Sequence, residues 1–115
     1  MEGKKAYRLW FAQRITAALI LVILAMHIYQ VHYIELGKPI LFAGVAVRLK
    51  DIFFLVLDFS LLFLGLFHGL NGIRMVLLDF DFLSKYERTI SRILLIVGII
   101  FFIIGVKGLW GFIIR

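Results

Sequence analysis

Three long runs of apolar residues dominate the sequence, from about Ile15 to Ile34, from Ile52 to Leu78 and from Ile93 to Ile114. A helix rises about 1.5 Å per residue, so each run is long enough to cross the roughly 30 Å hydrocarbon core of a bilayer. Strands are excluded, because open strands in lipid leave backbone groups unpaired and three strands cannot close a barrel. We therefore predict an all-α membrane protein with three transmembrane helices, forming one domain over residues 1–115.

The composition supports lipid as the solvent for most of the surface. Hydrophobic residues make up 63% of the chain and the mean hydropathy is +1.06, whereas soluble domains average ~45–50% apolar residues. The absence of cysteine excludes a disulfide scaffold, a thiol redox enzyme and a cysteine-ligated iron–sulfur protein. A large autonomous active site is also excluded, because three spans of ~20 residues use about half of the chain.

The formal net charge of +6 comes from basic residues at the ends of the apolar runs. They do not form one patch, so they indicate membrane anchoring and not nucleic-acid binding. Lysine and arginine are enriched in cytoplasmic segments, which predicts a cytoplasmic N-terminus and second connection and an external C-terminus. The residues counted on the cytoplasmic side are Lys4, Lys5, Arg8, Arg14, Lys85, Arg88 and Arg92, and those on the opposite side are Lys38, Arg48, Lys50 and Arg115.

Two connections join the apolar runs. The first, from Glu35 to Asp51, contains the only proline, Pro39, and two glycines. We expect it to be a loop that lies partly on the membrane interface. The second, from Asp79 to Arg92, is acidic at its start and basic at its end.

Polar residues in the first apolar run and just before it fall on one helical face. With about 100° per residue, Gln13, Thr16 and His27 lie within about 60° of one another. Polar groups inside a membrane are costly and are functional candidates by default. Arg14 points elsewhere at the cytoplasmic boundary, where it can reach an anionic group. For His27 alone, an interhelical hydrogen bond is an equally good interpretation.

The second apolar run carries the denser polar motif. Its glycines Gly65 and Gly69 form a small-xxx-small pair that allows close approach to the backbone. His68, Asn71 and Arg74 follow at spacings of three residues on the same side. This pattern suits a haem, with the imidazole as iron ligand, the glycines leaving room for the macrocycle and the arginine pairing with a propionate. Asp58 is interpreted as solvated or paired, and the third run as structural.

The string His68-x-x-x-Gly72-Ile73-Arg74-x-x-x-x-Asp79-Phe80 resembles the signature of the haem-binding membrane anchors of succinate dehydrogenase and the related fumarate reductases. The segment Gln13-Arg14-Ile15-Thr16-Ala17 is similar to the His-Arg-x-Ser-Gly stretch of that family. The number of helices, the length and the Gly-Leu-Trp-Gly at residues 108–111 fit as well, so the resemblance covers nearly the whole chain.

The resemblance implies a non-catalytic subunit of a succinate:quinone oxidoreductase in the inner (cytoplasmic) membrane. A flavoprotein and an iron–sulfur protein would carry the succinate and fumarate chemistry on the cytoplasmic side. This chain and a second anchor subunit would pack into a bundle that holds haem b and quinone. The motif and the resemblance together give candidate haem residues His68, His27, Arg14, Arg74, Asn71, Gly69 and Gly72, and candidate quinone residues Gln13, Thr16, Asp79 and Trp10.

Some positions depart from the family pattern. Phe80 stands where one anchor type has a tyrosine that acts at the quinone, and phenylalanine cannot donate a hydrogen bond. Trp10 replaces a serine found in some members, while Gln13 and Thr16 replace the usual histidine and serine. A polar lining therefore survives with different donors.

The number of haems depends on His27. In two-haem members of the family, a histidine of the first helix serves the outer haem and one of the second helix serves the inner haem. His27 lies about 20 Å from Arg14, and His68 about 15 Å from Leu78, so helical rise alone does not separate their depths. The resemblance predicts two b-type haems shared with the partner anchor, with one haem as the alternative.

Three other functions remain open on the sequence. The chain could be the haem anchor of a different membrane dehydrogenase. It could be a haem-free transporter or channel subunit in which His27, Asp58 and His68 relay protons. It could also be a purely structural assembly protein. A red colour on purification separates the haem proteins from the last two.

Overall fold

Helices make up almost all of the chain that the computed structural model describes, which is residues 3–33 and 41–113. The elements in chain order are α1 (Gly3–Ile28), the π-helix η1 (Tyr29–Tyr33), α2 (Phe42–Leu49), α3 (Ile52–Leu78), α4 (Asp81–Ser84) and α5 (Glu87–Ile113). No strand occurs among the described residues. The expected all-α class is confirmed.

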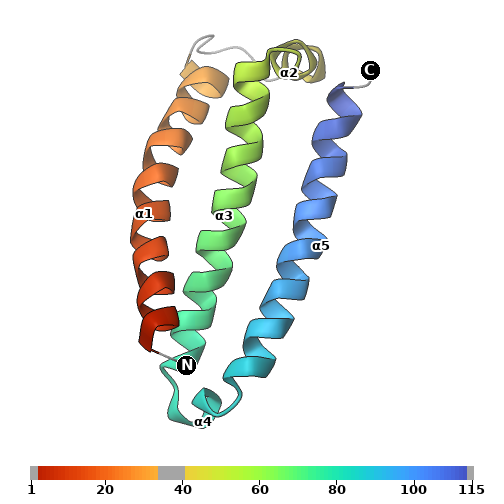
Figure 1. The fold of residues 1–115 in the computed structure, drawn as a ribbon. Coiled ribbons are helices and arrows are strands. Elements are labelled where there is room, and N and C mark those ends of the chain that lie inside the picture. Colours follow the sequence, from red (N-terminus) through yellow and green to blue (C-terminus); the bar gives the residue numbers. More distant parts are fainter. Residues whose placement is uncertain (1–2, 34–40, 114–115) are drawn as a thin grey trace.

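The three long helices lie side by side, with α3 between α1 and α5 (Figure 1). Each runs antiparallel to its neighbour, as short connections require. Helix α3 has 27 residues and so extends about 40 Å, which exceeds the roughly 30 Å hydrocarbon core. Its ends therefore lie at or beyond the two interfaces.

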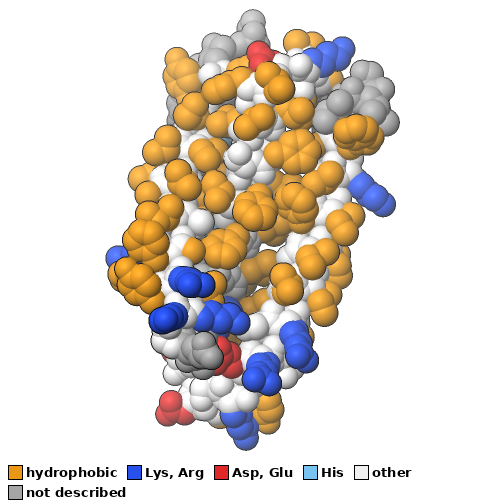
Figure 2. Space-filling view, viewed as in Figure 1, with side chains coloured by type: hydrophobic (Ala, Val, Ile, Leu, Met, Phe, Trp, Pro, Cys, Tyr) orange, Lys and Arg blue, Asp and Glu red, His pale blue; other side chains and the backbone are white. Residues whose placement is uncertain are grey.

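The surface of this layer is apolar. Three helices are long and apolar enough to span a membrane, over Gly3–Val31, Ile52–Leu78 and Glu87–Gly111. Only Leu49 and Leu57 are buried among the described hydrophobic residues. Figure 2 shows apolar side chains along the middle of the helices, and Lys and Arg gathered at the end near α4. The chain is a multi-pass membrane protein whose large faces are left for lipid or a partner.

Close packing between α3 and α5 depends on two glycines of α5. A Cβ atom at Gly98 would lie 2.8 Å from Cδ1 of Leu70, and one at Gly105 would lie 2.7 Å from Cδ2 of Leu62. Both distances are shorter than real Cβ contacts, so the leucines of α3 fill space that any larger residue would occupy. The sequence interpretation of the third apolar run as structural agrees with this packing.

The helix bounds differ from the expected ones at several places. Helix α3 begins and ends where the sequence predicted, but α1 begins at Gly3 and not near Ile15, and α5 at Glu87 and not near Ile93. Apolar runs mark the part of a helix in hydrocarbon, whereas backbone hydrogen bonding continues through the charged interface. The expected ends at Ile34 and Ile114 lie outside the described residues.

The first connection is not only a loop. Its second half forms α2, which lies across one end of the bundle against α3 and α5 (Figure 1). The sequence analysis missed this helix because Gly44 and the nearby proline indicate a loop, and because eight residues are too few for a clear periodicity. Pro39 itself lies outside the described residues.

Candidate functional site

Two polar layers lie between the apolar surfaces of the bundle. The first, the His68 layer, consists of Gln13, Thr16, His68 and Asn71 at the α1–α3 contact. The second, the His27 layer, consists of His27, Asp58 and Arg48. Thr16 and His27 are eleven residues apart on α1, and Asp58 and His68 are ten apart on α3, so the layers are separated by about 15 Å along the helices.

The geometry resolves a question that the sequence left open. Counting from Arg14 and Leu78 put the two histidines at similar depths, but α1 extends further than that count assumed. Thr16 contacts His68, so His68 is level with the middle of α1, whereas His27 lies near the end of that helix. The two histidines therefore occupy different levels of the bundle.

A hydroxyl group fixes the ring of His68. Oγ1 of Thr16 lies 3.0 Å from Nδ1 of His68 and 2.8 Å from the carbonyl oxygen of Ala12, one turn earlier on α1. When the hydroxyl donates its single proton to that carbonyl, as a threonine within a helix commonly does, its oxygen accepts from Nδ1–H. The tautomer that fits this arrangement carries its proton on Nδ1 and leaves the lone pair of Nε2 unused. A free Nε2 is what a metal ligand requires.

The rest of the His68 layer is an amide network. Nε2 of Gln13 donates to the carbonyl oxygen of His68 at 3.1 Å, and Nδ2 of Asn71 donates to Oε1 of Gln13 at 2.9 Å. A Cβ atom on Gly72 would lie 3.2 Å from Nε2 of Gln13, so the glycine makes room for that amide. Gln13 and Thr16 thus support His68 from α1, although the sequence assigned them to quinone.

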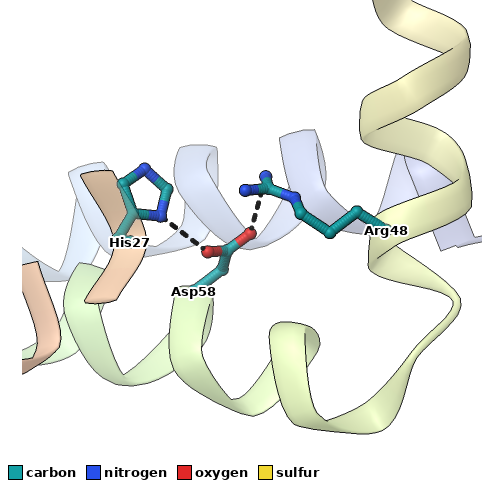
Figure 3. Close-up of polar contacts among 3 residues, drawn as sticks. All are labelled: His27, Arg48 and Asp58. Carbon is teal, nitrogen blue, oxygen red and sulfur yellow. Dashed lines mark hydrogen bonds and ion pairs between the residues drawn. The ribbon is translucent and has the colours of Figure 1, made fainter. Parts of the chain in front are cut away.

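The His27 layer joins three helices (Figure 3). Nδ1 of His27 lies 3.1 Å from Oδ1 of Asp58, and Nη2 of Arg48 lies 3.3 Å from Oδ2 of the same carboxylate. Because the paired carboxylate accepts, Nδ1 of His27 is the donor and its Nε2 is again left free. Asp58 was interpreted as solvated or paired, and it is paired.

Arg48 is a site residue that the sequence analysis did not find. It was counted only as a basic residue near the membrane, because nothing in the sequence shows that α2 brings it back onto α3. One signal was available. An aspartate inside an apolar run costs roughly 2.5–3.5 kcal/mol on insertion scales, so Asp58 needs a basic partner from a neighbouring segment.

Arg74 faces a different helix from His68. Its Nε donates to Oγ of Ser91 at 2.9 Å and its Nη2 lies 3.0 Å from Oε1 of Glu87, both on α5. Each three-residue step turns a helix back by about 60°, so the string from His68 to Arg74 covers about 120°. The predicted single face therefore divides, with Asn71 towards α1 and Arg74 towards α5.

The remaining predicted residues lie at the surface. The guanidinium of Arg14 stacks over the ring of Trp10 at 4.8 Å, and both are exposed. Asp79 is exposed at the end of α3. Among the described residues, none of these three forms a hydrogen bond with the side chain of Gln13 or Thr16.

Open space lies over two glycines of α3. A Cβ atom on Gly65 or Gly69 would meet no atom within 4 Å, in contrast to Gly72. These positions leave the backbone of α3 open beside His68. A separate hollow of about 340 Å³ lies between α3 and α5, apolar except for Asn71, Arg74 and Ser91 at one end.

A haem fits the donor set better than a bare metal ion. No group of three or more His, Cys, Asp or Glu residues forms a metal site among the described residues. A haem requires only one or two axial side chains, and each layer supplies one histidine with Nδ1 engaged. The open glycines beside His68 leave room for a flat group or a partner helix.

A known protein family matches most of the chain. Residues 3–106 match the family described as succinate dehydrogenase/fumarate reductase transmembrane subunit. That range contains both polar layers. A search of curated proteins found no match.

Proposed function

Because the chain belongs to the family of succinate dehydrogenase/fumarate reductase transmembrane subunits, we propose that it is the haem b- and quinone-binding anchor of a succinate:quinone oxidoreductase. The anchor role and the membership of a larger complex follow from the family itself. The partners proposed are a flavoprotein, an iron–sulfur subunit and a second anchor subunit. The proposed location is the inner membrane with the N-terminus in the cytoplasm, because basic side chains gather at the end near α4.

The observation that carries the haem proposal is the hydrogen bonding of the two histidines. In both layers a side-chain oxygen lies within hydrogen-bond distance of Nδ1, at 3.0 Å in one and 3.1 Å in the other. This holds each ring in a fixed orientation and leaves Nε2 for iron. We assign His68 to an inner haem and His27 to an outer haem. A haem b, when bound, accepts and releases one electron at its iron.

One chain of this size does not enclose a haem. Each layer offers one histidine, and the faces beside Gly65 and Gly69 are open. A second anchor with its own histidines would complete both pockets and supply the second axial ligand of each iron. The proposed bundle is therefore shared between two subunits.

We place the quinone at the cytoplasmic end of the bundle. Its reduction consumes two electrons and two protons, so it needs polar groups within reach of the iron–sulfur subunit. Arg14 and Trp10 are exposed there and can face the quinone, whereas Gln13 and Thr16 act behind them by holding His68. Asp79 ends α3 at the same interface.

The anchor of a different dehydrogenase is set aside by the family match. One observation favours the haem-free proton relay, which is that His27, Asp58 and Arg48 form a continuous polar chain. Purification of the tagged chain from its native membrane separates the two functions. We expect a red complex with a low-spin haem spectrum, a covalent flavin and succinate:quinone activity. A colourless complex would refute the haem assignment and favour the relay.

A further inference from the structure

A buried carboxylate lies at the centre of the His27 layer. Asp58 is the seventh residue of α3, about 9 Å along the helix from its first residue. Its side chain is only 9% exposed, and its two oxygens have different partners, His27 on one and Arg48 on the other. The layer thus combines an iron-ligand candidate with a balanced pair of opposite charges.

Arg48 is held firmly in this position. Leu49, the next residue, is 2% exposed. The backbone N–H of Asp51 donates to the carbonyl oxygen of Arg48 at 3.1 Å, and the carboxylate of Asp51 caps α3 by accepting from the N–H of Phe53 at 2.9 Å. The turn between α2 and α3 therefore fixes the backbone position from which the side chain of Arg48 extends.

The guanidinium also has little else to bind. Its Nε is buried and has no hydrogen-bond partner among the described residues. Within residues 3–33 and 41–113, its ion pair is the contact with Asp58 at 3.3 Å. A buried N–H without a hydrogen-bond partner destabilises the fold, so the position of this guanidinium is itself unfavourable apart from its contact with Asp58. Helix α2 serves to bring a positive charge to this carboxylate.

We infer that Asp58 and Arg48 are a positioning pair that orients His27 and sets the redox potential of the outer haem. This inference rests on the second haem of the proposed function. The carboxylate accepts from Nδ1–H, which fixes the ring and makes Nε2 a stronger donor, and this favours ferric iron. Arg48 opposes that effect by withdrawing charge from the same carboxylate.

The two members of the pair therefore have opposite effects. Removing the negative charge leaves the positive charge of Arg48 beside the haem and favours the ferrous state. Removing the positive charge leaves Asp58 uncompensated and favours the ferric state. The His68 layer contains no such pair, because its ring is held by the neutral hydroxyl of Thr16. We therefore expect only the outer haem to change its redox potential when Asp58 or Arg48 is replaced.

The experiment is a potentiometric titration of both haems in the whole purified complex. In Asp58→Asn the midpoint potential of one haem rises, and in Arg48→Gln the potential of the same haem falls. Arg48→Lys keeps the charge and stays near the wild-type value. Asp81→Asn, which removes an exposed carboxylate on α4, leaves both haems unchanged. If Asp58→Asn does not assemble, the two Arg48 variants carry the test.

The outcomes separate this inference from the proposal beneath it. A wild-type complex with one haem overturns both. Two haems whose potentials are the same in Asp58→Asn, Arg48→Gln and the wild type overturn the inference alone. Shifts of equal sign in the two variants also overturn it, because they indicate a loosened structure and not opposed charges.

Discussion

Replacing Thr16 by valine tests how the His68 layer works. Valine has nearly the same shape but lacks the hydroxyl that lies 3.0 Å from Nδ1 of His68. Thr16 is 8% exposed, so water does not replace the lost acceptor. An unsatisfied buried donor costs about 1–3 kcal/mol, and supporting groups of this kind change metal affinity by about 10–100-fold. We expect the inner haem to bind about 10–100-fold more weakly.

The assay is haem retention by the intact complex under challenge with excess apomyoglobin. Thr16→Val loses the inner haem faster than the wild type, while the outer haem is retained at the wild-type rate. Thr16→Ser keeps the hydroxyl and behaves like the wild type. Thr89→Val, at an exposed position of α5, is the matched control. Equal retention of both haems in Thr16→Val would mean that the hydroxyl does not support the iron ligand.

Two further predictions concern glycines. Gly105→Val lowers the thermal stability of the complex through overpacking of about 1–3 kcal/mol, because a Cβ there would lie 2.7 Å from a leucine of α3. The control Gly108→Val has open space around the new side chain and leaves the melting temperature unchanged. Equal melting temperatures of the two variants would contradict the observed packing. In Gly72→Ala the new Cβ would lie 3.2 Å from the side-chain amide of Gln13 and pushes that amide away from His68. We expect this displacement to shift the absorption spectrum of the inner haem. An unaltered spectrum would show that the amide network does not act on the ligand.

The sequence predicted the helices well where one physical constraint governs them. Runs of apolar residues must be helical in lipid, so α3 was placed at its observed bounds. The charged first turns of α1 were not predicted, because hydropathy indicates which residues lie in hydrocarbon and not where backbone hydrogen bonding of the helix begins. Helix α2 was missed because eight residues at an interface carry little periodic signal.

The candidate site was predictable as a set of residues but not as a set of contacts. Helical spacing put Thr16 and His27 on one face of α1, and in the structure both residues contact α3 from that face. Spacing could not tell which neighbour each residue of α3 meets, so Arg74 was grouped with His68 although it contacts α5. The approach of Arg48 to Asp58 depends on the path of the first connection, which no local pattern encodes.

The central claim is that this chain supplies one axial histidine to each of two haems. The most direct measurement is haem per covalent flavin in the purified complex, determined as the pyridine haemochrome. We predict two haems in the wild type and one in either His68→Ala or His27→Ala, with the lost haem differing between the variants. A single haem in the wild type, or an unchanged haem count in either variant, would contradict the claim.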